Sequence, residues 1–235
     1  MKIADVYSVK SIKPELCKDW LLNVHYAKRI PSISYAFGLF EGNVMIGVCT
    51  YGKPMSHTLI KNSFNGQYQD SFLELNRLVT IEGLHKNACS FFVGQCLKKI
   101  PKPKVIVSYA DTSQGHNGYV YQATNWVYTG LSAEFKDYMV KGLEHLHHAT
   151  IGDMVGRNDK NENLNRLELL KERFGEENVY LKERSRKHRY FFFLGSRNDR
   201  KNMANNLKYE VEEYPKGENK RYGINYKPQT QIELF

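Results

Sequence analysis

Residue types suited to chemistry gather most densely between residues 105 and 130. An apolar, β-branched run ends there in Tyr109-Ala110-Asp111, and a loop rich in Gly, His and Asn leads on to Tyr121. The carboxylate of Asp111 and the imidazole of His116 can each accept a proton, and the rings of Tyr109 and Tyr121 can stack on a flat substrate. Open α/β sheets commonly bind ligands where a buried strand opens into a loop. This stretch is therefore the first candidate for a functional site.

The same residues also have ordinary structural explanations. An Asp after a strand often caps an Asx-type turn. His116 lies between Gly115 and Asn117 and is expected to be flexible and exposed, either as a general base, a base-contacting residue or a plain loop residue. Aromatic residues at this spacing, including Trp126, belong more often to the core than to a pocket wall. The residue types alone leave these alternatives open.

A second polar group lies on a strand expected over Phe72–Ile81. Strand alternation places Glu74 and Asn76 on one face, and Arg77 follows directly. Polar residues at such positions indicate equally an exposed face at the edge of a sheet or a functional site. The turn after this strand contains Lys86 and Asn87, just before a predicted helix whose N-terminus can hold an anion.

Two basic segments are typical of solvated charge. His25-Tyr26 stands before Lys28-Arg29 at the end of a predicted helix, where basic side chains suit the helix dipole. Another basic run enters an apolar strand and could neutralise phosphates: Arg186, Lys187, His188 and Arg189. A separate feature is the C-terminal peptide, which resembles the bacterial sliding-clamp binding peptide through Gln231, Leu234 and Phe235.

These residues need a scaffold, and the hydrophobic pattern predicts an α/β order of elements. We expect a long loop over residues 53–70, an extended tail over 219–230, and the following elements. Helices are predicted over residues 11–26, 88–99, 119–123 and 163–174, and strands over residues 34–41, 43–52, 72–81, 105–111, 126–131, 135–141 and 190–194, with 126–131 and 135–141 as a pair.

Composition limits the classes of protein that remain. The chain has 235 residues, enough for one substantial core, and a net charge of +9 that favours a polyanionic partner. No apolar run approaches the length of a membrane span, and the first residues do not resemble a signal peptide. Four cysteines without CxxC pairing indicate reduced, buried thiols. We therefore expect a cytoplasmic protein with no membrane partner.

Several of these motifs together resemble the Mom family of phage DNA-modification proteins, which have a GNAT acyltransferase-like fold. The resemblance runs in order from His25-Tyr26 to Gly195. It includes Leu75-Asn76-Arg77-Leu78, Tyr109-Ala110-Asp111, Gln114-Gly115-His116, Gly118, Tyr121, Asn125-Trp126 and Lys187-His188-Arg189-Tyr190. It implies a GNAT-like mixed sheet flanked by helices, with a catalytic domain over residues 1–200 and an extension with a flexible tail over residues 201–235.

The resemblance also implies a function and roles for residues. The family adds a methylcarbamoyl-type group to adenine N6 and protects phage DNA from restriction in an infected bacterial cell. By this resemblance His25 and Tyr26 are candidate iron ligands, and Tyr109, Asp111, His116 and Tyr121 are catalytic candidates. An acyl-CoA or related donor is expected near Asn76, Arg77, Lys86 and Asn87, although the turn at residues 82–90 lacks the Gly-rich pattern of acyltransferases. DNA is expected at Arg186–Arg189 and Trp126, and a sliding clamp at the C-terminal peptide.

Two other functions stay open at this point. One is an ordinary GNAT acyltransferase that acts on a protein or a small molecule. The other is a non-catalytic protein that binds DNA or a sliding clamp.

Overall fold

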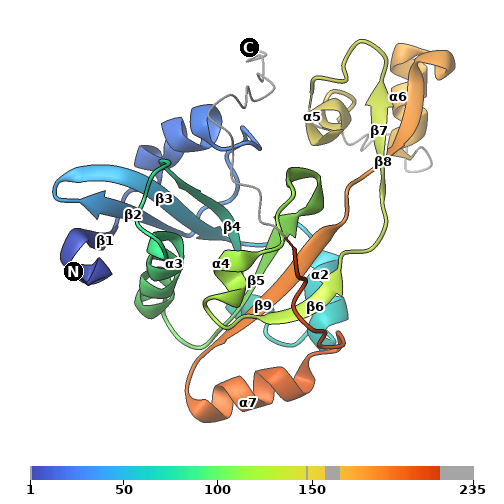
Figure 1. The fold of residues 1–235 in the computed structure, drawn as a ribbon. Coiled ribbons are helices and arrows are strands. Elements are labelled where there is room, and N and C mark those ends of the chain that lie inside the picture. The colour runs from blue at the N-terminus through green and yellow to red at the C-terminus, as the bar shows by residue number, and fades with distance from the viewer. Residues whose placement is uncertain (1, 147, 157–164, 218–235) are drawn as a thin grey trace. The chain divides into compact units, whose positions relative to one another are not determined.

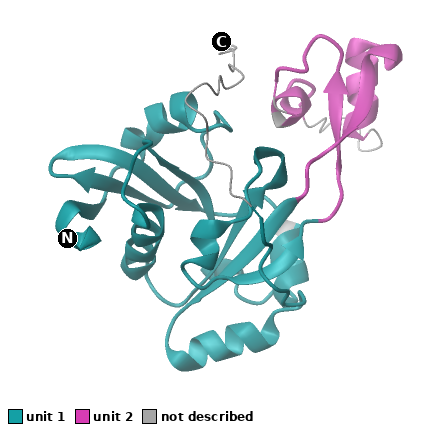
Figure 2. Ribbon diagram, in the orientation of Figure 1, with its two compact units in different colours: residues 1–132, 187–222 teal, residues 133–186, 223–235 magenta. Residues whose placement is uncertain are grey.

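The computed structural model describes residues 2–146, 148–156 and 165–217 (Figure 1). The chain divides into two compact units, residues 1–132 with 187–222 and residues 133–186 with 223–235 (Figure 2). The sequence analysis placed its boundary after residue 200, whereas the chain leaves unit 1 after Ser132 and returns to it at Lys187. Unit 2 is therefore an insertion, and the expected clamp peptide lies outside the described residues.

Unit 1 is built on a mixed seven-stranded sheet in the order β1-β2-β3-β4-β5-β9-β6. All neighbouring strands are antiparallel except β4 and β5, which are parallel. The strands are β1 (Tyr7–Ser11), β2 (Tyr35–Glu41), β3 (Val44–Gly52), β4 (Phe72–Thr80), β5 (Lys104–Asp111), β6 (Val127–Leu131) and β9 (Lys187–Leu194). A mixed central sheet flanked by helices, as predicted, is confirmed.

The parallel strands β4 and β5 pair over only three residues. The last pair joins Glu74 to Val107, yet β4 continues to Thr80 beside β3 and β5 continues to Asp111 beside β9. A bulge also interrupts β4, since its register with β3 shifts at Asn76. Bulges re-aim side chains, so polar residues of β4 occur where the sheet opens.

Helices cover both faces of this sheet (Figure 1). On one face, α3 (Ala88–Lys99) packs into a large core through Phe92, Val93 and Leu97. On the other face, α2 (His57–Phe64) and α7 (Arg197–Asn206) contribute Phe64 and Met203 to a second core cluster. Short helical segments complete the unit: α1 (Ile3–Val6), η3 (Gln69–Ser71), η4 (Thr112–Gln114) and α4 (Tyr119–Gln122).

Two predictions in the first third of the chain are wrong. The single helix expected over residues 11–26 is broken into a 3-10 segment, η1 (Pro14–Cys17), and a π segment, η2 (Trp20–Val24). It cannot begin at Ser11, because Ser11 pairs with Phe37 as the end of β1. The loop expected over residues 53–70 contains α2, which Ser56 caps by accepting a hydrogen bond from the Leu59 N–H at 3.2 Å.

The expected strand pair in the second half is also wrong. β6 pairs with β9 inside unit 1, whereas β7 (Lys136–Val140) pairs with β8 (Val179–Glu183) inside unit 2. Unit 2 adds α5 (His148–Asp153), α6 (Arg166–Phe174) and η5 (Glu176–Asn178), and its small core contains Met139, Ile151 and Leu170. No helix in the described residues has the length and apolar character to cross a membrane.

Candidate active site

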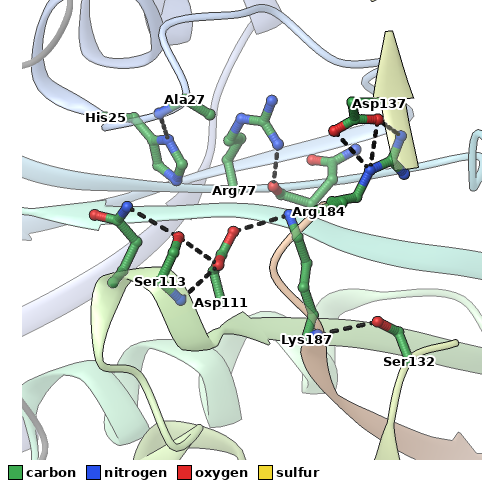
Figure 3. Close-up of polar contacts among 11 residues, drawn as sticks. His25, Ala27, Arg77, Asp111, Ser113, Ser132, Asp137, Arg184 and Lys187 are labelled. Carbon is green, nitrogen blue, oxygen red and sulfur yellow. Dashed lines mark hydrogen bonds and ion pairs between the residues drawn. The ribbon is translucent and has the colours of Figure 1, made fainter. Parts of the chain in front are cut away.

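Asp111 stands at the end of β5, where two other polar groups fix its carboxylate. One oxygen accepts hydrogen bonds from the Ser113 backbone N–H at 3.0 Å and the Ser113 hydroxyl at 2.7 Å. The other lies 3.1 Å from the Nζ of Lys187, which is its register partner on β9 (Figure 3). Asp111 thus caps η4, as the turn explanation predicted, and also forms an ion pair that joins two strands.

Electrostatics keep this carboxylate ionised. Burial raises the pKa of Asp111, but Lys187 and Ser113 outweigh burial and lower the pKa overall. A depressed pKa means that the ionised form stabilises the folded protein at neutral pH. That contribution is lost as pH falls below the ordinary value of 3.8 and through the folded pKa.

Replacing Lys187 by Met tests this ion pair. Without the ammonium group, burial dominates and the pKa of Asp111 rises, so the ionised carboxylate no longer stabilises the folded protein and the deficit of the variant should shrink as pH falls toward 3. At pH 7 the free energy of unfolding should fall by about 1–2 kcal/mol. Urea unfolding between pH 3 and pH 7 measures both effects, with Lys98→Met on the exposed side of α3 as the control. Superimposable curves for Lys187→Met and the wild type would show that the pair contributes nothing.

β4 supplies a second group, in which Arg77 is anchored to the backbone. Its guanidinium donates to the carbonyl oxygens of Asn76 at 2.6 Å and Arg29 at 3.2 Å. Its Nε–H is buried without a partner among the described residues. Burial lowers the pKa of Arg77, against the opposing effect of Tyr26 and Glu74. Both polar ends of Asn76 are already used, since its amide donates to Ser32 at 2.8 Å and accepts from Thr50 at 2.6 Å.

Glu74 is the residue that the sequence analysis placed on this face but did not select. Its side chain is partly buried. Burial raises the pKa of its carboxyl group to about 7, and Arg77 and Lys187 oppose that rise. The sequence signal that could have identified Glu74 is its position as an acidic residue in the otherwise apolar first half of β4.

The segment after η2 faces the same group of residues. His25 is 6% exposed, stacks on the Tyr26 ring at 4.4 Å, and accepts a hydrogen bond from the Ala27 N–H at 3.0 Å through Nδ1. Burial lowers the pKa of His25 to about 3, with further lowering by Arg77, His116 and Lys187. These effects place His25 close to residues from β4, β9 and the loop after β5.

His116 joins this group through the Tyr26 ring, with ring centroids 6.2 Å apart in an edge-to-face arrangement. The side chain is partly buried, rather than flexible and exposed as expected. Burial lowers the pKa of His116, and Asp111 opposes that change. Burial therefore favours the neutral form of the imidazole.

Two tyrosines near this polar group pack in different core clusters, Tyr121 in that of α3 and Tyr109 against that of α2 and α7. Tyr121 is 7% exposed, and its hydroxyl lies 2.8 Å from Ser108 Oγ, which also donates to the Leu75 carbonyl oxygen. Tyr109 is partly buried on β5. Burial raises the pKa of both tyrosines, and the negative charge of Glu74 adds to each rise. Both hydroxyls therefore stay protonated at neutral pH and can donate hydrogen bonds.

The family model for the Mom protein family matches residues 6–216 of this chain. The chain belongs to the Mom family. It is 28% identical over 228 residues to the methylcarbamoylase Mom of Escherichia phage Mu, and the match covers 89% of this chain and 86% of the phage protein. The family assignment made from the motifs is confirmed.

Solved structures give more distant matches. A GNAT-family acetyltransferase from Bacillus cereus is 12% identical with a TM-score of 0.40, and covers 80% of this chain and 96% of its own. The YncA protein from Salmonella typhimurium, solved with its cofactor acetyl-CoA, is 9% identical with a TM-score of 0.43, and the match covers 81% of this chain and 95% of YncA.

The iron site expected for a Mom-family protein does not fit the residues found here. Among the described residues, no three His, Cys, Asp or Glu side chains are grouped so as to hold a metal ion. The Nδ1 of His25 already accepts a backbone hydrogen bond, and the charges that act on this ring, from Arg77 and Lys187, are positive. A cation is disfavoured beside them, so the structure gives no support to His25 and Tyr26 as iron ligands.

Several residues of the Mom-like motifs are structural. Trp126 is completely buried and packs against Tyr121 and Phe192, which corrects the expectation that it stacks on DNA. Arg189 is 8% exposed, donates to Thr129 at 2.9 Å, and lies 3.5 Å from the centre of the Tyr209 ring. These two side chains therefore stabilise the fold and cannot contact phosphates as they stand.

The rest of the basic run also has partners within the chain. His188 lies 2.8 Å from the Tyr128 hydroxyl, and Arg186 lies 3.6 Å from a Glu134 carboxylate oxygen within unit 2. The run is thus no uninterrupted phosphate-binding surface, and DNA binding by Arg186 and His188 stays a prediction.

The predicted helix over residues 88–99 is confirmed with the same bounds, but the residue before it, Asn87, does not cap it. Asn87 has a positive φ of 69°, and its side chain makes no capping hydrogen bond. Lys86 precedes it in the turn between β4 and α3. Cofactor binding by these two residues stays a prediction.

Proposed function

We propose that this Mom-family chain is a DNA-modifying transferase that attaches a methylcarbamoyl-type group to adenine N6, and so protects DNA from restriction. The similarity over most of the chain to a methylcarbamoylase supports the type of reaction. The observation that carries the proposal is the polar group in unit 1, where side chains of four segments, most of them in the family motifs, act on one another. Its members are His25, Tyr26, Glu74, Arg77, Tyr109, Asp111, His116, Tyr121 and Lys187.

The proposed reaction makes specific demands on such a site. The adenine amino group is a weak nucleophile that lies inside the duplex, so the base must be extruded or presented on a single strand. The partly buried rings of Tyr26 and Tyr109 offer flat surfaces for a base beside the charged residues. The net charge of +9 attracts the DNA phosphates.

The donor of the methylcarbamoyl-type group needs protein side chains that bind its activated carbonyl. An acyl-CoA or related donor would supply an activated carbonyl carbon attached to a leaving group. The unpartnered Nε–H of Arg77 is suited to a carbonyl oxygen, because a buried donor without an acceptor is costly. Asn76 instead holds β4 to β3 and to the Ser32 backbone, so it positions Arg77.

The ion pair of Asp111 and Lys187 has an orienting function in this proposal. It joins the end of β5 to the start of β9, and Asp111 also orders the first turn of the loop that carries His116. The low pKa of Asp111 makes it a weak proton acceptor. Removal of the Asp111 side chain should therefore act by misplacing neighbouring groups, and not by removing a proton acceptor.

Mass spectrometry of nucleosides tests the function. The chain is expressed in bacteria with a plasmid, and the plasmid is digested to nucleosides. We expect a heavier deoxyadenosine species with the wild type, and a level at least about 100-fold lower with Asp111→Ala. Asp70→Ala, at an exposed position in η3, is the control and should retain the wild-type level.

Unmodified adenine from soluble, folded wild-type protein would contradict the proposal. In that case labelled acetyl-CoA and a bacterial lysate would show whether a protein or a small molecule accepts the group instead.

A further inference from the structure

Glu74 occupies a special place in the sheet of unit 1. It forms the last pair between β4 and β5, and beyond it the two parallel strands have different partners. An acidic side chain at the end of this pairing lies beside the opening in the sheet. The chain has placed a carboxyl group where the backbone of two strands separates.

The surroundings of Glu74 come from four elements. Arg77 of β4 and Lys187 of β9 are the positive groups that act on it. Tyr109 of β5 and Tyr121 of α4 each respond to its negative charge. All four neighbours belong to the candidate active site, so the Glu74 carboxyl belongs to it as well.

Glu74 differs from Asp111 in what its carboxylate contacts. Asp111 accepts two hydrogen bonds from Ser113 and forms an ion pair with Lys187. No described residue donates a hydrogen bond to the Glu74 carboxyl, and only burial and the more distant charges of Arg77 and Lys187 act on it. A partly buried carboxyl without hydrogen bonds is free to accept one from a substrate.

The pKa values of the site residues further distinguish the candidates for a general base. A general base works best when its pKa is near the working pH. Burial raises the pKa of Glu74 to about 7, whereas His25 has its pKa lowered to about 3 and Asp111 has a depressed pKa. Among these three groups, Glu74 alone combines a carboxyl group that accepts no hydrogen bond from a described residue with a suitable proton affinity.

We propose that Glu74 is the general base of the modification reaction, an inference that rests on the proposed function. The amine nitrogen attacks the activated carbonyl carbon of the donor, and a new N–C bond forms. One N–H bond of the amine breaks, and its proton passes to the Glu74 carboxylate. The bond from the carbonyl carbon to the leaving group breaks with its electron pair on the leaving group, which then takes the proton from Glu74.

Neutral variants of Glu74 test the proposal in the same plasmid assay. Glu74→Gln keeps the shape of the protonated side chain but cannot accept a proton, so the modified adenine should fall at least about 100-fold. Glu74→Asp keeps a carboxyl group one methylene further back and should restore a level between Gln and the wild type. Glu82→Gln, an exposed acid after β4, should match the wild type.

If Glu74 had only a structural function, its replacement would lower the thermal melting temperature together with the modification. Loss of an unpaired, partly buried acid should leave the thermal melting temperature at pH 8 unchanged or higher, so inactivity with an intact melt supports the proposal. Glu74→Leu is measured beside Glu74→Gln, and whichever variant folds decides the result. A neutral variant that keeps more than half of the wild-type modification overturns the proposal while the function stands. Absence of modification by the wild type overturns the function itself.

Discussion

Replacing Arg77 by Met is expected to lower adenine modification about 1,000-fold. In the proposed function the guanidinium stabilises charge that develops on a carbonyl oxygen, and loss of such a donor typically reduces rates by about 10²–10³. The change also breaks a mechanical link, since Arg77 donates to the Arg29 carbonyl and so ties β4 to the segment after Tyr26. Both losses act on the same step.

The conservative variant and a control make this result specific. Arg77→Lys keeps a positive charge but lacks the planar arrangement of donors, so we expect it to recover only a small part of the activity. Arg200→Met removes an exposed arginine from α7 and should leave modification unchanged. Modification by Arg77→Lys at the wild-type level would show that charge alone suffices, and would remove the carbonyl-binding function from Arg77.

Substitution of Gly118 by Ala should strongly destabilise unit 1. Gly118 has a φ of +74°, and a Cβ atom there would lie 2.4 Å from the Tyr190 ring. The ring cannot easily move, because its hydroxyl donates to the Asn117 carbonyl at 2.5 Å and accepts from Gln122 at 3.1 Å. Backbone strain and overpacking together should reduce the free energy of unfolding by about 3 kcal/mol.

A matched glycine separates backbone strain from the clash. Gly42 also has a positive φ, +58°, but a Cβ atom there meets nothing within 4 Å. Gly42→Ala should therefore reduce stability by only about 1 kcal/mol. Thermal melts should show a fall of about 6–12 °C for Gly118→Ala and about 2–4 °C for Gly42→Ala. Equal shifts for the two variants would mean that Tyr190 yields without resistance.

Local features of the fold could be predicted from the sequence. The helix Ala88–Lys99 has the predicted bounds, and the strand expected over residues 72–81 ends one residue early, at Thr80. The hairpin of β2 and β3 around Gly42 was also found, because its alternation and its turn residue lie within a short window. Such features depend on neighbouring residues, which a single sequence displays directly.

Long-range pairing could not be predicted in the same way. β9 inserts between β5 and β6 although it comes later in the chain than both, and nothing in its apolar run indicates those partners. The polar contacts of the candidate site also depend on long-range strand pairing. Asp111 was recognisable after a strand, but its contact with Lys187 depends on that pairing. Trp126 and Arg189 shared motifs with site residues, and only their burial distinguishes them.

The insertion that forms unit 2 leaves and re-enters the sheet at adjacent points. The Ser132 N–H donates to the Lys187 carbonyl oxygen at 2.8 Å, so the two ends meet like the ends of a tight hairpin. An insertion of this kind can lengthen, shorten or be exchanged between relatives without changing the order of strands. The strands that carry Glu74 and Asp111 can therefore keep their order while the inserted segment changes in length.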